Sequence, residues 1–268
     1  MELKVLSIEK QEVGKKKLPK QFDEPVRADI VKKAIEAIQA NRRQPYGADP
    51  RAGKRASANV SRRRNNYKTS YGHGISRVPR KVLTRRGTRF NWVGAVAPGT
   101  VGGRRAHAPN PEKDWRKKIN KKENRKAIRS AIAATINPEF VKERGHSVPE
   151  GYPFIIESKI EEVKKAKDAK KALEKIGLAE DLKRVSKRTI RAGRGKTRGR
   201  KYRTKKGPLL VVSDDCSLIK SCGAIPGLEV VNVKKINAEL LAPGTHLGRL
   251  TLFTDKSIEI MENDKLFM

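Results

Sequence analysis

The sequence has few acidic residues, few aromatic residues and only two cysteines. It holds 29 Asp and Glu residues against 63 Lys and Arg residues, which gives a formal net charge of +34. Such an imbalance says little about the fold, but it predicts a polyanionic partner. Cys216 and Cys222 have a spacing that suits neither a zinc site nor a redox pair. We expect both to be small buried thiols in a reducing compartment.

Long apolar runs and motifs for metals or cofactors are also missing. No run of 18 apolar residues and no signal peptide is recognisable, so we expect a soluble intracellular protein without membrane contacts. The four histidines are scattered, and no Ser/His/Asp set can be placed. The sequence therefore predicts no bound metal and no cofactor. Asp214-Asp215 ends an apolar run and could hold a metal, but capping of the next helix is the simpler interpretation.

A nucleotide-binding P-loop is absent as well, although one segment ends like one. Gly195-Lys196-Thr197 matches the last three positions of that motif, but Ile190 stands where its first glycine should be. The residues before this segment are charged and helix-like, and those after it have no apolar helical face. Nothing would aim a helix N-terminus at a triphosphate, so these cations suit a larger polyanion.

Most of the positive charge lies in two blocks. Residues 41–110 hold 17 basic residues and one acid, Asp49, whereas residues 183–206 hold 13 basic residues and no acid. The rest of the chain is nearly balanced. A merely solvated face would carry counter-charges, which both blocks lack. The blocks therefore predict binding to a polyanion.

The first block has no amphipathic element between residues 42 and 110. A stretch of this length without one is either disordered or functional. Aromatic side chains between arginines favour RNA binding, because bases stack on rings and on guanidinium planes. Trp92 could alternatively pack against a nearby core. The five aromatic residues of the block are Tyr46, Tyr67, Tyr71, Phe90 and Trp92.

Outside the two blocks, helix-like and strand-like segments alternate. Helical periodicity is present over residues 23–41, 114–136 and 159–177. Near-continuous apolar runs are typical of parallel strands that are buried on both faces. We therefore predict an α/β fold with a mostly parallel twisted sheet flanked by helices, and a long basic irregular loop inserted near the N-terminus. Strands are expected at residues 4–8 and within 153–158, 208–215, 227–233 and 249–254.

Three motifs resemble one known family. "YGHGISRVPRK" (71–81), "GGRRAHAP" (102–109) and "KKGPLLVVSDD" (205–215) resemble large-ribosomal-subunit protein four, of the archaeal and eukaryotic type. The resemblance covers essentially the whole chain. The chain ends soon after residues 249–254, without the long C-terminal extension of eukaryotic members, so an archaeal member is expected.

The resemblance implies a non-catalytic protein of the cytoplasmic ribosome that binds large-subunit ribosomal RNA and aids subunit assembly. It implies contacts with neighbouring ribosomal proteins, including a second tunnel-lining protein, and with the nascent peptide, but no membrane and no homo-oligomer. The loop would thread into the RNA, and its tip would line the narrow part of the peptide exit tunnel. The implied tip residues are His73, Ile75, Arg77, Val78, Pro79 and Arg80.

Together these arguments divide the chain into two parts. Residues 1–41 and 111–268 would form a single α/β domain that contains the RNA-contacting segment 183–206, and residues 42–110 would form an extended RNA-penetrating loop. The residues expected to contact RNA are Arg51, Lys54, Arg55, Arg62, Arg63, Arg64, Arg85, Arg86, Arg89, Trp92, Arg104, Arg105, Lys117, Lys121, Arg191, Arg194, Lys196, Arg198, Arg200, Lys201 and Arg203.

Two other functions remain open at this point. An RNA-modifying enzyme of the methyltransferase type would need a glycine-rich turn directly after the first strand, where the sequence offers only Gly14. A free RNA chaperone would bind RNAs broadly and would not co-sediment stoichiometrically with a ribosomal subunit.

Overall fold

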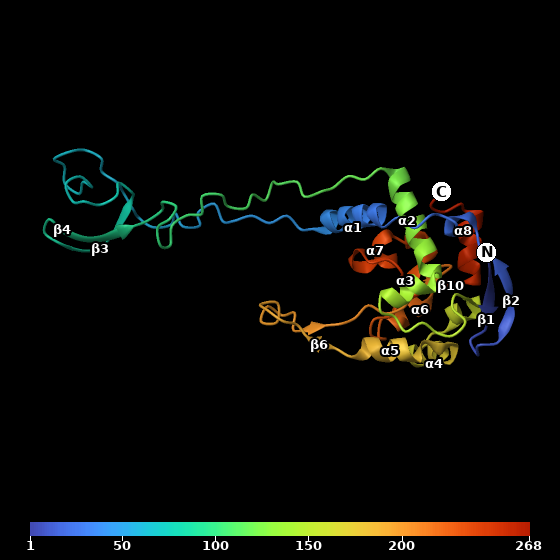
Figure 1. Cartoon of the computed structure of the whole chain (residues 1–268). Coiled ribbons are helices and arrows are strands. Elements are labelled where there is room, and N and C mark those ends of the chain that lie inside the picture. The colour runs from blue at the N-terminus through green and yellow to red at the C-terminus, as the bar shows by residue number, and fades with distance from the viewer. The chain divides into compact units, whose positions relative to one another are not determined.

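The computed structural model describes residues 1–268, which divide into two units (Figure 1). Unit 1 comprises Met1–Arg42 and Arg116–Met268, and unit 2 comprises Arg43–Trp115. None of the helices is long and apolar enough to span a membrane.

A six-stranded sheet forms the centre of unit 1, with the strand order β2-β1-β5-β10-β8-β9. Strand β2 runs antiparallel to β1, and all other neighbouring strands are parallel. This confirms the predicted α/β class with a mostly parallel sheet flanked by helices. The strands span Glu2–Leu6 (β1), Glu12–Lys17 (β2), Ile155–Ile156 (β5), Leu209–Val212 (β8), Glu229–Asn232 (β9) and Thr251–Thr254 (β10).

Helices cover both faces of the sheet, so its central strands β5, β10 and β8 are buried at every position. All four residues of β8 are buried. Since successive side chains of a strand point to opposite faces, Leu209 and Val211 enter one core, whereas Leu210 and Val212 enter the other. Helices α1 and α2 lie on the opposite side of the sheet from α4 and α5 (Figure 1).

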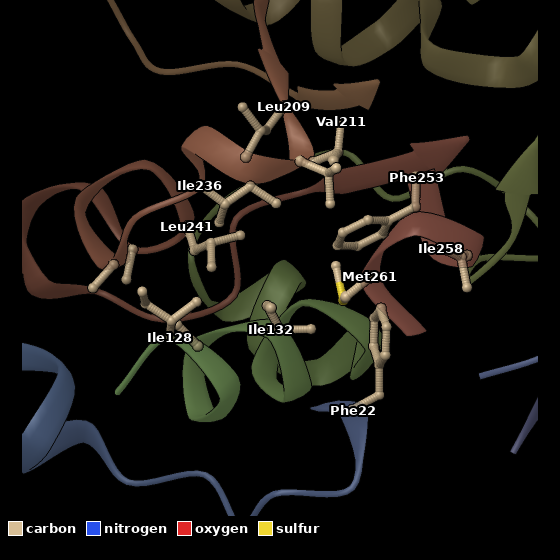
Figure 2. Packing of buried hydrophobic residues seen from close by; sticks show 14 of the residues in the cluster. Phe22, Ile128, Ile132, Leu209, Val211, Ile236, Leu241, Phe253, Ile258 and Met261 are labelled. Atoms are coloured by element: carbon tan, nitrogen blue, oxygen red, sulfur yellow. The ribbon is translucent and has the colours of Figure 1, made fainter. Parts of the chain in front are cut away.

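The first core is closed by α1 (Ala28–Arg42), α2 (Lys121–Ile136), α7 (Ala238–Leu241) and α8 (Asp255–Asn263). Figure 2 shows Phe22 and Phe253 converging with Ile132 and Met261 in this core. The two phenyl rings meet edge to face, with centroids 5.3 Å apart. Burial of each such side chain contributes about 1.5–3 kcal/mol.

The second core is covered by α3 (Pro138–Glu143), α4 (Ala166–Leu173), α5 (Ala179–Ser186) and α6 (Ser217–Cys222). Val141, Leu173, Leu182 and Leu218 come from these four helices in turn. Short helical turns complete unit 1 at Lys20–Phe22 (η1), Ser158–Glu162 (η2), Glu174–Leu178 (η3), Val233–Lys235 (η4) and Pro243–Thr245 (η5).

Three predicted helices have different bounds in the structure. The helix expected over residues 23–41 begins at Ala28, because the Arg27 amide donates to Ser130 Oγ (2.6 Å), which fixes the preceding chain in an extended form. The helix expected over 114–136 begins only at Lys121, after Asn120 in an extended conformation. The helix expected over 159–177 is divided into η2, α4 and η3, which ends around Gly177 with a φ of +114°.

Unit 2 contains a hairpin that the sequence pattern did not reveal. Strand β3 (Arg80–Arg86) pairs antiparallel with β4 (Arg89–Gly94) through a two-residue turn that starts at Gly87, whose φ of +57° suits glycine. Of the residues of unit 2, only Ser70 and Ala95 are buried. The unit therefore has almost no core of its own.

Candidate nucleic-acid interface

The basic block at residues 183–206 contains an exposed hairpin between α5 and β8. Strand β6 (Thr189–Ile190) pairs with β7 (Tyr202–Arg203). Residues 189–203, which comprise both strands and the turn between them, form the basic hairpin. Strand β6 precedes the P-loop-like residues, contrary to the sequence-based expectation of no strand there. It is nevertheless short and exposed, and a turn follows Lys196 where a P-loop would continue into a helix.

The cations of the basic hairpin face solvent. Arg191 is half-buried, because its Nε donates to the Arg200 carbonyl (3.1 Å). The other cations of the hairpin are exposed: Arg194, Lys196, Arg198, Arg200, Lys201 and Arg203. None of these seven side chains pairs with a carboxylate in the structure, so their charges are available to an external anion.

A buried ion network fixes the two ends of this block. At one end Asp181, which is completely buried, accepts from Arg184 Nε (2.8 Å) and from the Ser147 amide (3.1 Å). His146 lies beside them, with Nδ1 3.1 Å from an Arg184 terminal nitrogen. Burial lowers the pKa of His146, and the charges of Arg184 and Arg144 act in the same direction, whereas Asp181, 3.3 Å from Nδ1, acts against them.

At the other end of the block, Arg249 is fully buried and holds the chain that enters β8. It donates to the Gly207 carbonyl (2.9 Å), the Leu240 carbonyl (2.9 Å) and Glu229 (2.6 Å). Burial favours a higher pKa for Glu229, but Arg249 and Lys206 hold it below its usual range. The network gives the basic hairpin a rigid attachment to the sheet.

Unit 2 carries the cations of the other block. Arg55 pairs with Asp49, and Arg85 Nε donates to the Gly87 carbonyl (3.1 Å). Arg104 is half-buried, and its amide donates to the Val96 carbonyl (3.1 Å). The remaining predicted RNA-binding cations of this unit are exposed: Arg51, Lys54, Arg62, Arg63, Arg64, Arg86, Arg89 and Arg105.

Aromatic rings in unit 2 gather into a small cluster around β4. Phe90 stacks with Trp92 (5.6 Å between centroids) and meets Tyr67 edge to face (5.5 Å). Lys68 Nζ lies 5.6 Å from the Tyr67 and Phe90 ring centres. Trp92 is half-buried here and belongs to neither hydrophobic core, so the alternative that it packs against a core is wrong.

The implied tip residues lie next to this cluster. His73 and Ile75 line a cavity of about 570 Å³ together with Arg89, Phe90 and Trp92. The structure thus brings two implied tip residues together with two predicted RNA-contacting residues. His73 itself is exposed, and Ile75 is half-buried.

The remaining tip residues are tied into the hairpin of unit 2. The guanidinium of Arg77 lies 4.8 Å from the Tyr71 ring centre. The Pro79 carbonyl accepts from the Ala95 amide (2.8 Å), and Arg80 opens β3. Val78, between them, is half-buried.

Trp115 lies before the start of α2, although a helix was expected from residue 114 onward. It belongs to unit 2 and stacks on Tyr46, with ring centroids 5.7 Å apart. The Arg43 guanidinium is 3.7 Å from its ring centre. Tyr46, which was expected to be available for base stacking, therefore already has an aromatic partner.

Two predicted cations lie at the start of α2 or just before it. Lys117 pairs with Glu36 (3.2 Å), so its charge is partly compensated within the chain. Lys121 is exposed at the first position of the helix. Along α2, Lys126 and Arg129 both pair with Glu24, whose pKa the Arg129 hydrogen bond lowers.

Internal counter-charges are scarce across both basic blocks. Of the thirty basic residues, ion pairs with carboxylates form at Arg42, Arg55, Arg184 and Lys206. So many like charges in an exposed position repel one another unless anions neutralise them. The arrangement is therefore suited to a polyanion with closely spaced phosphates.

The opposite edge of the sheet offers no comparable site. Open α/β sheets usually bind ligands at the carboxyl ends of their strands. Here Glu161 fills that edge, because it accepts from the Ser213 amide (2.9 Å) and from Thr254 Oγ1 (2.7 Å). Asp215 pairs with Lys235 (2.6 Å) and does not cap α6, so the capping interpretation is wrong.

The segment after β1 and the two cysteines also lack the features of an enzyme or metal site. Strand β1 leads through a turn into antiparallel β2, whereas a methyltransferase-like fold would need a helix after a glycine-rich turn. Cys222 is buried, which raises the pKa of its thiol to about 11, while Cys216 is only half-buried, unlike the expectation for both. Neither thiol belongs to a group of metal-ligating residues.

Sequence reasoning also missed residues that line a cavity at the base of the basic hairpin. Arg144, His146 and His246 come from segments with no recognisable motif, so nothing in the sequence singled them out. Lys205 and Lys206 belong to the second basic block, and their charge was the only available signal.

Comparison with known proteins identifies relatives over the whole chain. The model of the ribosomal protein L4/L1 family matches residues 16–264. The large ribosomal subunit protein uL4 of Nanoarchaeum equitans is 46% identical over 268 residues, covering 100% of both chains. The uL4 proteins of Methanopyrus kandleri and Archaeoglobus fulgidus are each 44% identical and cover 98% and 97% of this chain, and 98% of their own lengths.

Proposed function

The chain belongs to the ribosomal protein L4/L1 family, and on this premise we propose how its two units act in the large ribosomal subunit. It is a non-enzymatic structural protein of the cytoplasmic ribosome, where it binds ribosomal RNA and neighbouring ribosomal proteins. The roles of the RNA-modifying enzyme and of the free chaperone have no support.

The two basic blocks bind the phosphate backbone of large-subunit ribosomal RNA. The observation that carries this proposal is that only four of their thirty cations have carboxylate partners within the chain. Arginine and lysine side chains release condensed counter-ions when they meet phosphates, and this release drives association. The cluster of Tyr67, Phe90 and Trp92 adds surfaces on which bases can stack.

Residues 42–110 act as a long basic loop that enters the RNA and helps the subunit to assemble. An extended arm of about 35 residues reaches at most roughly 115–125 Å, which is enough to penetrate a large RNA. Support comes from the near absence of buried residues in unit 2, because a segment without a core must be ordered by its partner. The protein acts as a single copy in the subunit.

The tip of this loop lines the peptide exit tunnel beside a second tunnel-lining protein and contacts the nascent peptide. Its residues mix small, apolar and basic side chains, and His73 and Arg77 are exposed. Such a mixture makes a poor core but a plausible wall for a passing peptide. The tip and the flanking arms therefore have separable roles.

The arm role is tested by replacing three adjacent arginines. We expect the triple variant Arg62→Ala, Arg63→Ala and Arg64→Ala to enter large subunits less efficiently than the wild type, because three phosphate contacts are lost. A matched control removes three exposed lysines outside the blocks, at positions 32, 164 and 167. Sucrose-gradient profiles of both strains measure incorporation. Equal incorporation of the two variants would contradict the arm role.

The tip role is tested with the double variant His73→Ala and Arg77→Ala. Both side chains are exposed, and both residues lie outside strands β3 and β4. Subunits should assemble normally, while translation of a reporter that carries a stalling peptide should change. Unchanged stalling together with normal subunits would rule out the tunnel role, and failed assembly would show that the tip is an anchor.

A further inference from the structure

A large cationic cavity lies at the base of the basic hairpin, at the amino ends of the parallel strands. Its volume is about 980 Å³, and five lysine and arginine residues line it against one acid, Glu143. The cations come from three separate stretches of the chain. They are Arg144, Arg184, Arg203, Lys205 and Lys206.

Arg144 differs from the other cations because it is partly buried and lacks a carboxylate partner. It is half-buried, and its guanidinium donates to two carbonyls, those of Pro243 (2.7 Å) and His246, with no carboxylate as partner. Burial, together with the charges of Arg249 and Arg184, lowers the pKa of Arg144 to about 10. A buried cation normally has a counter-ion, and this one still has N–H groups available for an anion.

Two of the other cations that line the cavity have carboxylate partners, and two do not. Arg184 is fixed by Asp181, and Lys206 by Glu229. Arg203 and Lys205 are exposed and pair with no carboxylate. The cavity therefore has a rigid frame with an excess of positive charge.

The cavity also has an apolar part and is larger than a phosphate needs. Phe140 and Leu247 contribute half-buried apolar surface to the lining. A ligand that combines an anion with a flat ring would use both parts. A nucleotide displaced from a helix has this combination, because its base is free to leave the stack.

We propose that this cavity binds a bulged nucleotide of ribosomal RNA, with its phosphate on Arg144, Arg203 and Lys205 and its base against Phe140. The inference rests on the proposed RNA-binding function and adds to it a defined site for one unpaired nucleotide. Paired segments would contact only the exposed cations of the basic hairpin. Free phosphate offers the same charge but no base.

The test uses ultraviolet crosslinking of large subunits that contain the full chain, followed by mass spectrometry of the peptide–nucleotide products. We expect a crosslink at Phe140 to a nucleotide that chemical probing shows to be unpaired. The variant Arg203→Gln with Lys205→Gln should lower this crosslink at least about tenfold, because it removes two of the three cations that would hold the phosphate. The control variant Lys164→Gln with Lys167→Gln loses the same charge outside the cavity and outside both basic blocks, and should keep the crosslink.

The outcomes separate this inference from the function on which it rests. Crosslinks in the basic hairpin without one at Phe140, or a Phe140 crosslink to a paired nucleotide, would overturn the bulged-nucleotide site and leave RNA binding intact. Absence of crosslinks throughout both basic blocks would count against the proposed function itself. Inorganic phosphate added at constant ionic strength should leave the Phe140 crosslink unchanged. Its loss would show that the cavity takes a free anion.

Discussion

Arg249 shows how a single residue can hold a charge inside this sheet. Its side chain has no exposed surface, yet it donates hydrogen bonds to three carbonyls and to Glu229. Removing a guanidinium from water is costly, and only such a complete set of partners offsets the cost. The residue ties together the chain segments that enter β8 and β9.

Replacement of Arg249 should therefore be among the most damaging single changes in unit 1. We expect Arg249→Leu to lower the free energy of unfolding by about 3–5 kcal/mol, because it leaves Glu229 without its buried partner and the Gly207 and Leu240 carbonyls without their donor. Urea denaturation of the full chain measures the loss. As a control, Lys206→Gln removes the exposed partner of Glu229 and should cost less than about 1 kcal/mol. Similar losses for both variants would contradict this account.

His146 should make the stability of unit 1 sensitive to mild acid. Its pKa in the folded protein lies below the ordinary 6.5. As the pH falls, the unfolded chain therefore binds a proton at this histidine before the folded chain does. This contribution is fully present above pH 6.5 and is lost as the pH falls, with a slope of up to about 1.4 kcal/mol per pH unit.

The pH dependence is measured by urea denaturation of the full chain between about pH 5 and 7.5, compared with the His146→Gln variant. The variant should lose the slope in this window, whereas His107→Gln, which changes an exposed histidine of unit 2, should keep it. A slope that survives in His146→Gln would assign it to another group.

At the scale of elements, strands with buried side chains could be predicted from the sequence, whereas exposed strands could not. Strand β8 could be predicted because all four of its side chains are buried, so its apolar run is unbroken. Strand β2 could not, because it is an edge strand with three lysines and no buried residue. The β3–β4 hairpin was missed for the same reason, since its pairing depends on the backbone and on a turn at Gly87.

The two-stranded hairpin of unit 2 also predicts how the free protein behaves. A hairpin without a core is only marginally stable in water. We expect limited proteolysis of the isolated chain to cut first within residues 42–110, while unit 1 stays intact. Cleavage sites are identified by mass spectrometry. Preincubation with large-subunit ribosomal RNA should protect the region, and resistance of residues 42–110 in the free chain would argue for an independent fold.

At the scale of the whole molecule, the charge blocks were visible in the sequence but their three-dimensional partners were not. The cations of residues 183–206 could be proposed as an RNA-binding segment because they follow one another along the chain. Arg144 and His246 are about a hundred residues apart and meet only in the folded protein. A cavity built from such distant segments leaves no local pattern to read.

The net charge predicts the salt dependence of RNA binding. If about ten cations engage single-stranded phosphates, log K should fall with log salt with a slope near −7. Filter binding or fluorescence anisotropy over a salt series measures it. The triple alanine variant at positions 62–64 should reduce the slope by about two. A wild-type slope near −1 would mean that the charge is mostly solvated.

The closure of the sheet's carboxyl edge by Glu161 has a consequence for how this protein can evolve. A substitution of Glu161 would remove three hydrogen bonds from the ends of strands β8 and β10, so the carboxyl edge tolerates few changes. At the amino edge, an exposed cation such as Arg198 can be exchanged for another cation at little cost to folding. New RNA contacts can therefore arise at the amino edge without loss of the fold, whereas new catalysis at the carboxyl edge would first require that the fold be weakened.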